Sequence, residues 1–343
     1  MISHYHFNAQ LSSQEAGDKE TTMKNMIIRF LLIAAVLCTW SASSLAAYPD
    51  KPIRFICTSA AGSPLDLMMR TLAQYLGKEL NQTIVVENRP GGTGAVGMAN
   101  AMNSPADGYT VVSATGSTSF LIADGKSAYT LDDFIFIRGL QAEPSAIAVR
   151  KDSPFQSLPQ LVDTLKKTPA QVSIGGYATA GFHQFSYYRL QQAAGFRGVW
   201  VPFQGGNQAV LALIGDHIQA AAITPSSALP QLKSGELRML AISTPTRDAY
   251  FPNVPTFKEQ GYDVVETLWR GVMVKKGTPP EVIKVLSEGM DRVEANPEWK
   301  RFMTENVQAP QNMTVEQMQK HVRDEVKTRR AFLHDLRAQQ AEH

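Results

Sequence analysis

The stretch IRFICTSAAGSPLDLMM, residues 53–69, runs from a short apolar strand through a loop of small residues into an amphipathic helix. Its first residues, Ile53–Ile56, have the length and the side chains of a buried strand. Ser63 followed by Pro64 is typical of a helix start, because serine caps the first turn and proline needs no hydrogen-bonded N–H there. The stretch therefore predicts a strand, a loop and a helix in that order.

The same order recurs along the chain. Two more strands are expected at 83–87 and 109–113, with a short helix at 98–102 between them. After Glu143 the pattern restarts, with strands expected at 145–149, 172–176, 198–202, 219–223 and 237–242 and helices at 180–194 and 207–214. A further strand is expected at 269–274, and capping boxes that begin at Thr278 and Thr314 predict two C-terminal helices. This alternation predicts an α/β protein with parallel sheets, in two lobes of which one is discontinuous.

A glycine-rich loop, residues 87–97, follows the second strand. Its Gly92-x-Gly94-x-x-Gly97 spacing matches that of dinucleotide-binding loops. Pro90 separates the strand from the glycines, however, and no acidic residue stands about 20 residues further on, where it would meet a ribose. We therefore interpret this segment as a loop that lets backbone segments pack closely, and we expect no nucleotide or other cofactor.

The N-terminal region predicts export from the cytoplasm. Residues 23–47 contain a positively charged start, a short apolar core and small residues before a cleavage site near Ala46 or Ala47, as in secretory signal peptides. The apolar core is shorter than the ~20 residues that a membrane-spanning helix needs. Residues 1–22 precede this pattern and suggest an upstream extension, with Met23 or Met26 as the initiator. We expect the mature chain, from Tyr48, to be periplasmic.

Composition narrows the function classes. The formal net charge is +2, and no basic stripe is interleaved with aromatic residues, so nucleic-acid binding is not expected. The mature chain retains only Cys57, which excludes an internal disulfide. The histidines of the mature chain are scattered without the i, i+4 spacing of metal ligands, and no metal site is expected.

Six motifs, in order and with matching spacing, resemble the tripartite tricarboxylate transporter (TTT) receptor family, the Bug-type periplasmic solute-binding proteins. They lie at 48–53, 87–94, 105–110, 201–206, 240–247 and 252–261. The resemblance implies a type II periplasmic binding-protein fold, two α/β lobes around a cleft that closes like a Venus flytrap. It places lobe I at 48–144 and 266–343 and lobe II at 145–265. It also implies a monomeric protein that binds a small carboxylate-bearing solute and delivers it to a TTT-type membrane permease.

In open sheets of this kind, ligands bind beyond the carboxyl ends of the strands, where loops lead into helix N-termini. Backbone N–H groups and helix dipoles at those places favour a carboxylate. The predicted ligand-binding residues are Ser59, Ala61, Gly62, Ser63, Asp66, Thr115, Gly116, Ser117, Tyr177, Thr179, Ala180, His183, Gln204, Gly205 and Thr224.

The roles of three of the charged or titratable residues in this region stay open from the sequence. Asp66 corresponds to an acidic residue of the family; it orients the loop, meets an amino group or only complements the helix dipole. His183 matches a family histidine that either donates to a carboxylate or is structural. Arg270 either pairs with a ligand carboxylate or forms a salt bridge at the surface or hinge.

Two departures from the family pattern bear on the solute. The first loop of the family usually has two glycines before its helix, whereas here Gly62 is followed by Ser63 and Pro64. In the second-lobe loop, Tyr177 and Thr179 stand where the family usually has glycines. This added bulk favours a solute with an aromatic or apolar part over citrate-like polycarboxylates. The sequence alone does not identify the solute.

Two other function classes remain open at this point. A secreted hydrolase could use Ser59, His183 and Asp66, although the sequence has no Gly-x-Ser-x-Gly elbow around a nucleophile. A sensing module for a membrane signalling partner would use the same two-lobed fold.

Overall fold

The computed structural model describes residues 48–125 and 128–341. The predicted signal peptide and upstream extension, residues 1–47, lie outside this range. Among the described residues, none of the helices combines the length and apolar character needed to cross a membrane.

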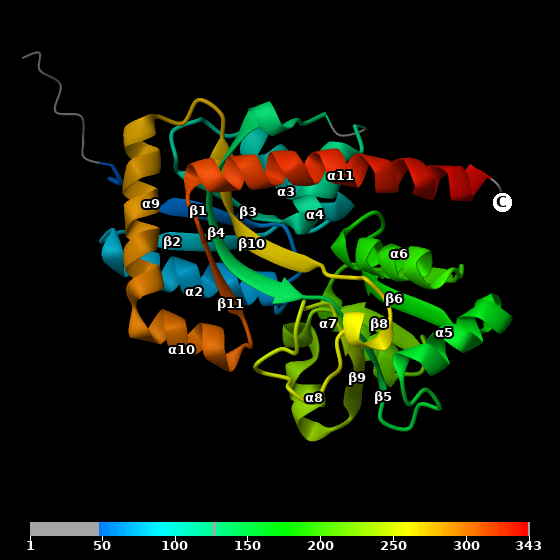
Figure 1. The fold of residues 1–343 in the computed structure, drawn as a ribbon. Helices are drawn as coiled ribbons and strands as arrows, with labels where there is room; N and C mark the ends of the chain where they lie inside the picture. Colours follow the sequence, from blue (N-terminus) through cyan, green and yellow to red (C-terminus); the bar gives the residue numbers. More distant parts are fainter. Residues whose placement is uncertain (1–47, 126–127, 342–343) are drawn as a thin grey trace, which may run out of the picture. The chain divides into compact units, whose positions relative to one another are not determined.

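Six strands form the first sheet, in the order β11-β4-β10-β3-β1-β2 (Figure 1). The strand β1 pairs in parallel with β2 and β3, whereas β10 runs antiparallel to both β3 and β4. The strands are β1 (Ile53–Cys57), β2 (Ile84–Asn88), β3 (Thr110–Thr115), β4 (Phe134–Pro144), β10 (Thr267–Lys275) and β11 (Ala309–Met313).

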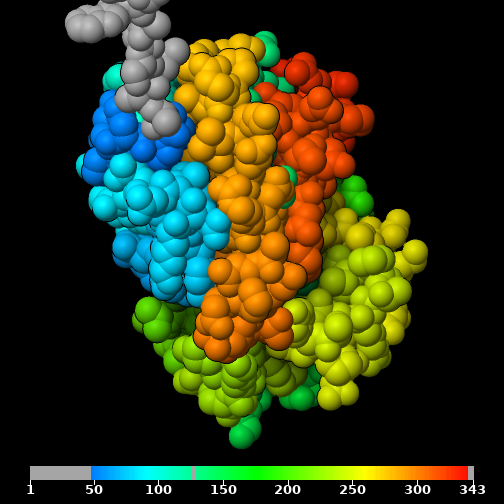
Figure 2. Space-filling model, turned by 90° about the vertical axis from the view of Figure 1, so that its left-hand side faces the viewer, coloured from blue at the N-terminus to red at the C-terminus, as the bar shows by residue number. Residues whose placement is uncertain are grey.

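Helices from both ends of the chain pack against this sheet. The helix α2 (Pro64–Glu79) packs against α9 (Pro280–Ala295), where Gly289 allows close contact with Leu76. Figure 2 shows α9 and α10 (Pro297–Glu305), in orange, running down one face beside the blue and cyan N-terminal residues. The remaining helices of this part are α3 (Ala95–Met102), α4 (Gly116–Ala123) and α11 (Val315–Ala341).

Five strands form the second sheet, in the order β7-β6-β8-β5-β9. The strand β6 pairs in parallel with β7 and β8, and β5 runs antiparallel to β8 and β9. The strands are β5 (Ala146–Arg150), β6 (Ser173–Tyr177), β7 (Val199–Phe203), β8 (Ala220–Ile223) and β9 (Leu237–Ile242). The helices of this part are α5 (Leu158–Lys167), α6 (Phe182–Ala194), α7 (Gly206–Ile214) and α8 (Leu229–Ser234).

The chain passes between the sheets twice, and the two crossings are hydrogen-bonded to each other. The first crossing is Ser145, between β4 and β5, and the second leads from β9 to β10. The Ser145 amide donates to Ser243 Oγ at 2.8 Å, and the Ser243 amide donates to the Ser145 carbonyl at 2.8 Å. Both crossings therefore lie side by side where the sheets meet.

Most of the expected elements are confirmed, but the prediction of parallel sheets is wrong: both sheets are mixed, because β10 and β5 run antiparallel to their neighbours. All nine expected strands are present, with ends shifted by no more than a few residues. Strands β4 and β11 were not expected, since Arg138, Gly139 and Gln141 interrupt the apolar pattern of β4. Helices α4, α5, α8 and α10 also lay outside the expected elements.

The two predicted capping boxes had different outcomes. The Thr314 box is confirmed, because the Thr314 amide donates to Gln317 Oε1 at 2.9 Å and the Gln317 amide donates back to Thr314 Oγ1 at 3.4 Å. The Thr278 box is wrong. The N-cap of α9 is Pro279, and the Thr278 hydroxyl donates to the Lys275 carbonyl at 2.8 Å instead.

The glycine-rich loop is a packing loop, as interpreted from the sequence. Gly91 and Gly94 have φ angles of 126° and 105°, which side-chain-bearing residues rarely adopt. A Cβ on Gly97 would lie 2.7 Å from Thr58 Cγ2, so the glycine lets α3 approach the loop after β1. The spacing that resembles a nucleotide-binding loop thus serves backbone contact.

Candidate functional site

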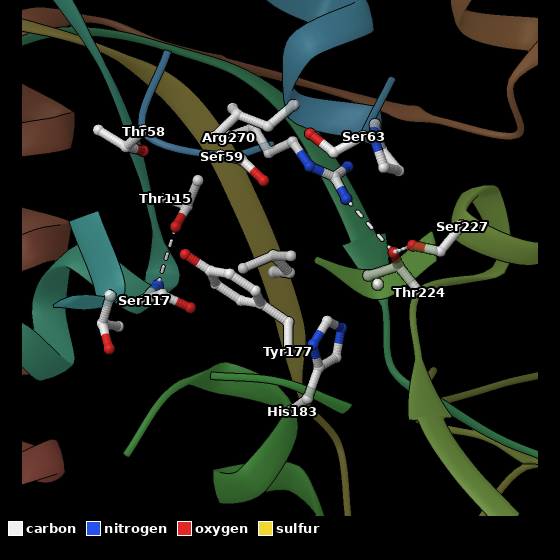
Figure 3. A pocket seen from close by; sticks show the side chains of 15 residues that line it. Thr58, Ser59, Ser63, Thr115, Ser117, Tyr177, His183, Thr224, Ser227 and Arg270 are labelled. Atoms are coloured by element: carbon white, nitrogen blue, oxygen red, sulfur yellow. Dashed lines mark hydrogen bonds between the residues drawn. The ribbon is translucent and has the colours of Figure 1, made fainter. Parts of the chain in front are cut away.

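A cavity of about 40 Å³ lies where loops from both sheets face each other (Figure 3). Both sheets contribute to it from the carboxyl ends of parallel strands, where the sequence placed the ligand loops. Its lining residues are Thr58, Ser59, Ser63, Pro64, Leu65, Thr93, Thr115, Ser117, Tyr177, His183, Gly206, Thr224, Ser227, Leu268 and Arg270.

Four helices begin at this cavity. Ser63 is the N-cap of α2, Thr115 is the N-cap of α4, and His183 and Gly206 lie in the first turns of α6 and α7. Helix N-termini carry partial positive charge and unpaired N–H groups. Their convergence makes the cavity favourable for an anion.

Three hydroxyl groups of the cavity each accept a hydrogen bond from a backbone N–H. Ser63 Oγ accepts a hydrogen bond from the Asp66 amide at 3.2 Å, and Thr115 Oγ1 accepts one from the Ser117 amide at 3.1 Å. Ser117 Oγ in turn accepts one from the Phe182 amide at 3.3 Å. Because each oxygen already accepts a backbone N–H, each hydroxyl proton is left to donate to something else.

Arg270 brings a buried positive charge to the cavity from β10. Its Nη1 donates to Glu143 Oε2 at 2.7 Å and to Gln308 Oε1 at 2.8 Å. Its Nη2 reaches Thr224 Oγ1 at 3.4 Å, across to the second sheet (Figure 3). Arg270 is therefore a buried ion-pair partner that also lines the cavity. Of the two alternatives for Arg270, a salt bridge is present but buried, and pairing with a ligand carboxylate stays a prediction.

Glu143 ties this arginine to the second sheet. The carboxylate is fully buried at the end of β4, and it accepts the Ser226 amide at 2.6 Å and the Ser226 hydroxyl at 2.8 Å. Gln308 Nε2 also donates to Glu143 Oε2, at 3.0 Å. The ion pair thus connects β4 and β10 with the turn after β8.

His183 is buried with both ring nitrogens lacking a hydrogen-bond partner among the described residues. Burial, reinforced by the nearby charge of Arg270, lowers its pKa from 6.5 to about 3. The imidazole is therefore neutral at physiological pH, with one nitrogen able to donate and the other able to accept.

The neutral state of His183 predicts a pH dependence of stability. Between pH 6.5 and about 3, the unfolded histidine binds a proton and the folded one does not, so stability is lost as the pH falls through this window. The His183→Leu variant is expected to reduce the slope of unfolding free energy against pH there by up to about 1.4 kcal/mol per pH unit. Urea unfolding of both proteins at several pH values measures it. Parallel curves would contradict a neutral buried His183.

Seven of the predicted ligand-binding residues line the cavity: Ser59, Ser63, Thr115, Ser117, Tyr177, His183 and Thr224. The other eight do not line it: Ala61, Gly62, Asp66, Gly116, Thr179, Ala180, Gln204 and Gly205. These eight are neighbours of lining residues in the same loops. Sequence position alone did not separate the residues that point inward from those that shape the loop.

Asp66 organises the first loop from behind. Its carboxylate accepts hydrogen bonds from the Gly62 amide at 2.9 Å, from Arg70 Nε at 3.0 Å and from Asn88 Nδ2 at 2.8 Å. Although burial acts to raise it, these bonds hold the pKa of Asp66 below its ordinary value. Of the alternatives for Asp66, the geometry fits the loop-orienting role.

Sequence reasoning missed eight lining residues. Five of them, Thr58, Pro64, Leu65, Gly206 and Ser227, lie next to or within a few residues of predicted ones, so the loop signal pointed to them. Thr93, Leu268 and Arg270 come from the glycine-rich loop and β10. The sequence raised Arg270 only as a possibility, and nothing in it placed the other two at the cavity.

Two hydrogen bonds cross between the two sides beside the cavity. Thr93 Oγ1 donates to the Thr179 carbonyl at 3.3 Å, and Ser117 accepts from the Phe182 amide. Thr93, Ala178 and Ala180 have positive φ angles between 53° and 62°, which cost energy for residues with a Cβ. The strain lies in the two loops that meet across the cavity.

The arrangement does not form a catalytic triad. The ring nitrogens of His183 bond to neither Ser59 nor Asp66, and the partners of Asp66 are Gly62, Arg70 and Asn88. Within the described part of the chain, no cluster of three or more His, Cys, Asp or Glu side chains could hold a metal ion.

Comparison with known proteins identifies relatives of the chain. Residues 68–337 match the family model described as tripartite tricarboxylate transporter family receptor. Protein BugT of Bordetella pertussis is 31% identical over 265 residues, which cover 75% of this chain and 80% of BugT.

Solved structures share the fold. A periplasmic transporter has a TM-score of 0.79 at 29% identity, covering 84% of this chain and 97% of its own. A TctC solute-binding protein from Polaromonas has a TM-score of 0.65 at 27% identity, and the match covers 84% of this chain and 99% of the Polaromonas protein. The chain has the two-lobed α/β architecture of periplasmic binding proteins, with a cleft between the lobes.

Proposed function

Because the chain belongs to the tripartite tricarboxylate transporter receptor family, we propose that it captures a small carboxylate-bearing solute in the periplasm and delivers it to a TTT-type membrane permease. The family is one of solute-binding receptors rather than enzymes. The solute leaves the cavity chemically unchanged.

The observation that carries this proposal is the combination of hydrogen-bond donors and positive charge in the lining of the cavity. Ser63, Thr115 and Ser117 present hydroxyl protons, four helices present their N-termini, and Arg270 presents a guanidinium. None of the described side chains that line the cavity is an acid. A carboxylate, which only accepts hydrogen bonds, complements this surface.

The proposed lobes are residues 48–144 with 266–343, and residues 145–265. The ends of β4 and β9 and the starts of β5 and β10 support these boundaries. We place the hinges near Glu143–Pro144 and between Ile242 and Trp269, where the two crossings are hydrogen-bonded through Ser145 and Ser243. A solute stabilises the closed form only through contacts with both lobes. Arg270 and Ser117 on one side and His183 and Thr224 on the other supply such contacts.

A binding screen of the chain from Tyr48 onward tests the function. In a panel of mono-, di- and tricarboxylates, at least one carboxylate is expected to raise the melting temperature, and amines and neutral sugars are not. A solute at 100 times its dissociation constant should stabilise the fold by about 2.7 kcal/mol. Mass spectrometry should recover the same solute after incubation. A product different from the added solute would favour the hydrolase instead, and a panel without any stabilising carboxylate would contradict the proposal.

A further inference from the structure

We propose that the solute is a short hydroxy monocarboxylate of about three carbons, whose length is limited by Tyr177 and whose hydroxyl contacts His183. This inference rests on the proposed function and names the class of solute within it. It follows from the volume of the cavity, the placement of Tyr177 and the charges that line the cavity.

The volume of the cavity limits the size of the solute. One water molecule needs roughly 10–15 Å³ of cavity volume measured in this way, although its share of the volume of liquid water is about 30 Å³. A cavity of about 40 Å³ therefore has room for about three waters, which corresponds to about 90 Å³ of solute. Lactate is of that size, whereas a longer dicarboxylate such as adipate is not. Hydrogen bonds from Thr93 to Thr179 and from Phe182 to Ser117 hold the two sides together at this volume.

Tyr177 occupies the space that a longer solute would need. It is the last residue of β6, and its hydroxyl extends into the cavity towards Thr115 and Ser59 (Figure 3). Its ring packs edge-on against the His183 ring at 6.4 Å between centroids. The Tyr177 side chain therefore fills part of the cleft and leaves less room for an aromatic solute.

The backbone holds Tyr177 in this position. Tyr177 is paired with Phe203 in the parallel β6–β7 ladder, and the next amide, Ala178, donates to the Phe203 carbonyl at 2.9 Å. Trp200 Nε1 donates to the Ala178 carbonyl at 3.1 Å. Because strand pairing and these two bonds fix the chain at the base of the side chain, a long solute cannot displace the ring by shifting the loop.

The charges that line the cavity allow one carboxylate. Arg270 is the single lining residue with a permanent positive charge among those described, and Glu143 already balances that charge from behind. A second carboxylate would depend on helix N-termini and hydroxyls without a cation of its own, so the lining favours a monocarboxylate over a dicarboxylate.

His183 provides the contact for an uncharged polar group. Its two ring nitrogens are buried without partners in the described structure, and a neutral imidazole offers one donor and one acceptor. The accepting nitrogen of His183 suits a solute group that donates a hydrogen bond, and the other nitrogen suits a solute group that accepts one. A hydroxyl can donate to one ring nitrogen or accept from the other, so it pairs one nitrogen of His183, whereas the methylene of an unsubstituted acid pairs neither.

Calorimetry with three probes tests the inference. Racemic lactate, propionate and adipate are titrated into the chain from Tyr48 and into its Tyr177→Ala and Tyr177→Phe variants. The unmodified chain is expected to bind lactate about tenfold more tightly than propionate, because propionate leaves His183 unsatisfied. It should bind lactate at least about 100-fold more tightly than adipate, because adipate overfills the cavity.

The variants separate length from hydroxyl chemistry. Tyr177→Ala should narrow the preference for lactate over adipate to less than about tenfold, and Tyr177→Phe should keep it, because the ring and not its hydroxyl limits the length. The His183→Leu variant should bind lactate and propionate alike, and His183→Gln, which retains a donor and an acceptor, should restore part of the difference. Melting curves establish that each variant is folded.

The outcomes are distinguishable. If the unmodified chain binds adipate within tenfold of lactate, the size limit is wrong while the carboxylate-binding function stands. If folded Tyr177→Ala still rejects adipate, Tyr177 does not set the length. If lactate and propionate bind equally to the unmodified chain, His183 does not contact a hydroxyl. If no carboxylate binds the unmodified chain, the proposed function itself fails.

Discussion

Replacing Arg270 by methionine is expected to lower the free energy of unfolding by about 3–5 kcal/mol and to abolish carboxylate binding. The loss of stability arises because Glu143, which is fully buried, would lose the cation 2.7 Å away. The Ser226 and Gln308 bonds to Glu143 would remain, but they do not balance its charge. Urea unfolding measures the first effect, and calorimetry with the best carboxylate of the screen measures the second.

A second variant separates the structural role of Arg270 from its role in binding. Glu143→Gln combined with Arg270→Met removes both charges, and replacement of a buried ion pair by groups of similar volume is often neutral or stabilising. The double variant is therefore expected to recover most of the lost stability while it still fails to bind. If the double variant binds the carboxylate with unchanged affinity, Arg270 is a structural residue and the cavity selects anions through its hydroxyls and helix N-termini alone.

Replacing Phe332 by alanine is expected to lower the free energy of unfolding by about 3–5 kcal/mol, as for other buried phenylalanines. Phe332 lies on α11 and is 2% exposed. Its ring centroid lies 5.6 Å from that of Phe120, 5.2 Å from that of Phe185 and 4.8 Å from that of Tyr188. The last two residues belong to α6, so Phe332 joins the C-terminal helix to the helix that carries His183 (Figure 1).

The same substitution is expected to weaken solute binding without a change in any cavity residue. The contact between α11 and α6 favours the arrangement in which His183 and Arg270 line the same cavity. A further bond from the Tyr188 hydroxyl to Asp335 at 2.5 Å supports this contact. Loss of the Phe332 ring removes part of this preference for the closed form, which reduces the apparent affinity. Arg330→Ala, at an exposed position two residues earlier, is the matched control and should change neither quantity. A stable, folded Phe332→Ala variant with unchanged affinity would contradict a role of α11 in closure.

The candidate site could be predicted in part because several of its loops have a local signature. Ser63, Thr115 and His183 follow the ends of predicted strands and precede helices, so the direction of the chain placed them at one edge of a sheet. The exclusion of Asp66 from the cavity was not predictable, because its side chain points back to Gly62 and Asn88. Which side of a loop faces a cavity depends on contacts that are not local in sequence.

By itself, the sequence determined the alternation of strands and helices, the capped start of α2, the break after Glu143 and the family of the chain. These features follow from hydrophobic periodicity, capping residues and local turn chemistry, which act over a few neighbouring residues. Only the tertiary structure decided that Arg270 reaches both Glu143 and the cavity, that Thr93 of the glycine-rich loop meets Thr179, and that α11 packs against α6. These contacts join residues up to 147 positions apart, and they depend on how two sheets pack together, for which the sequence carries no local pattern.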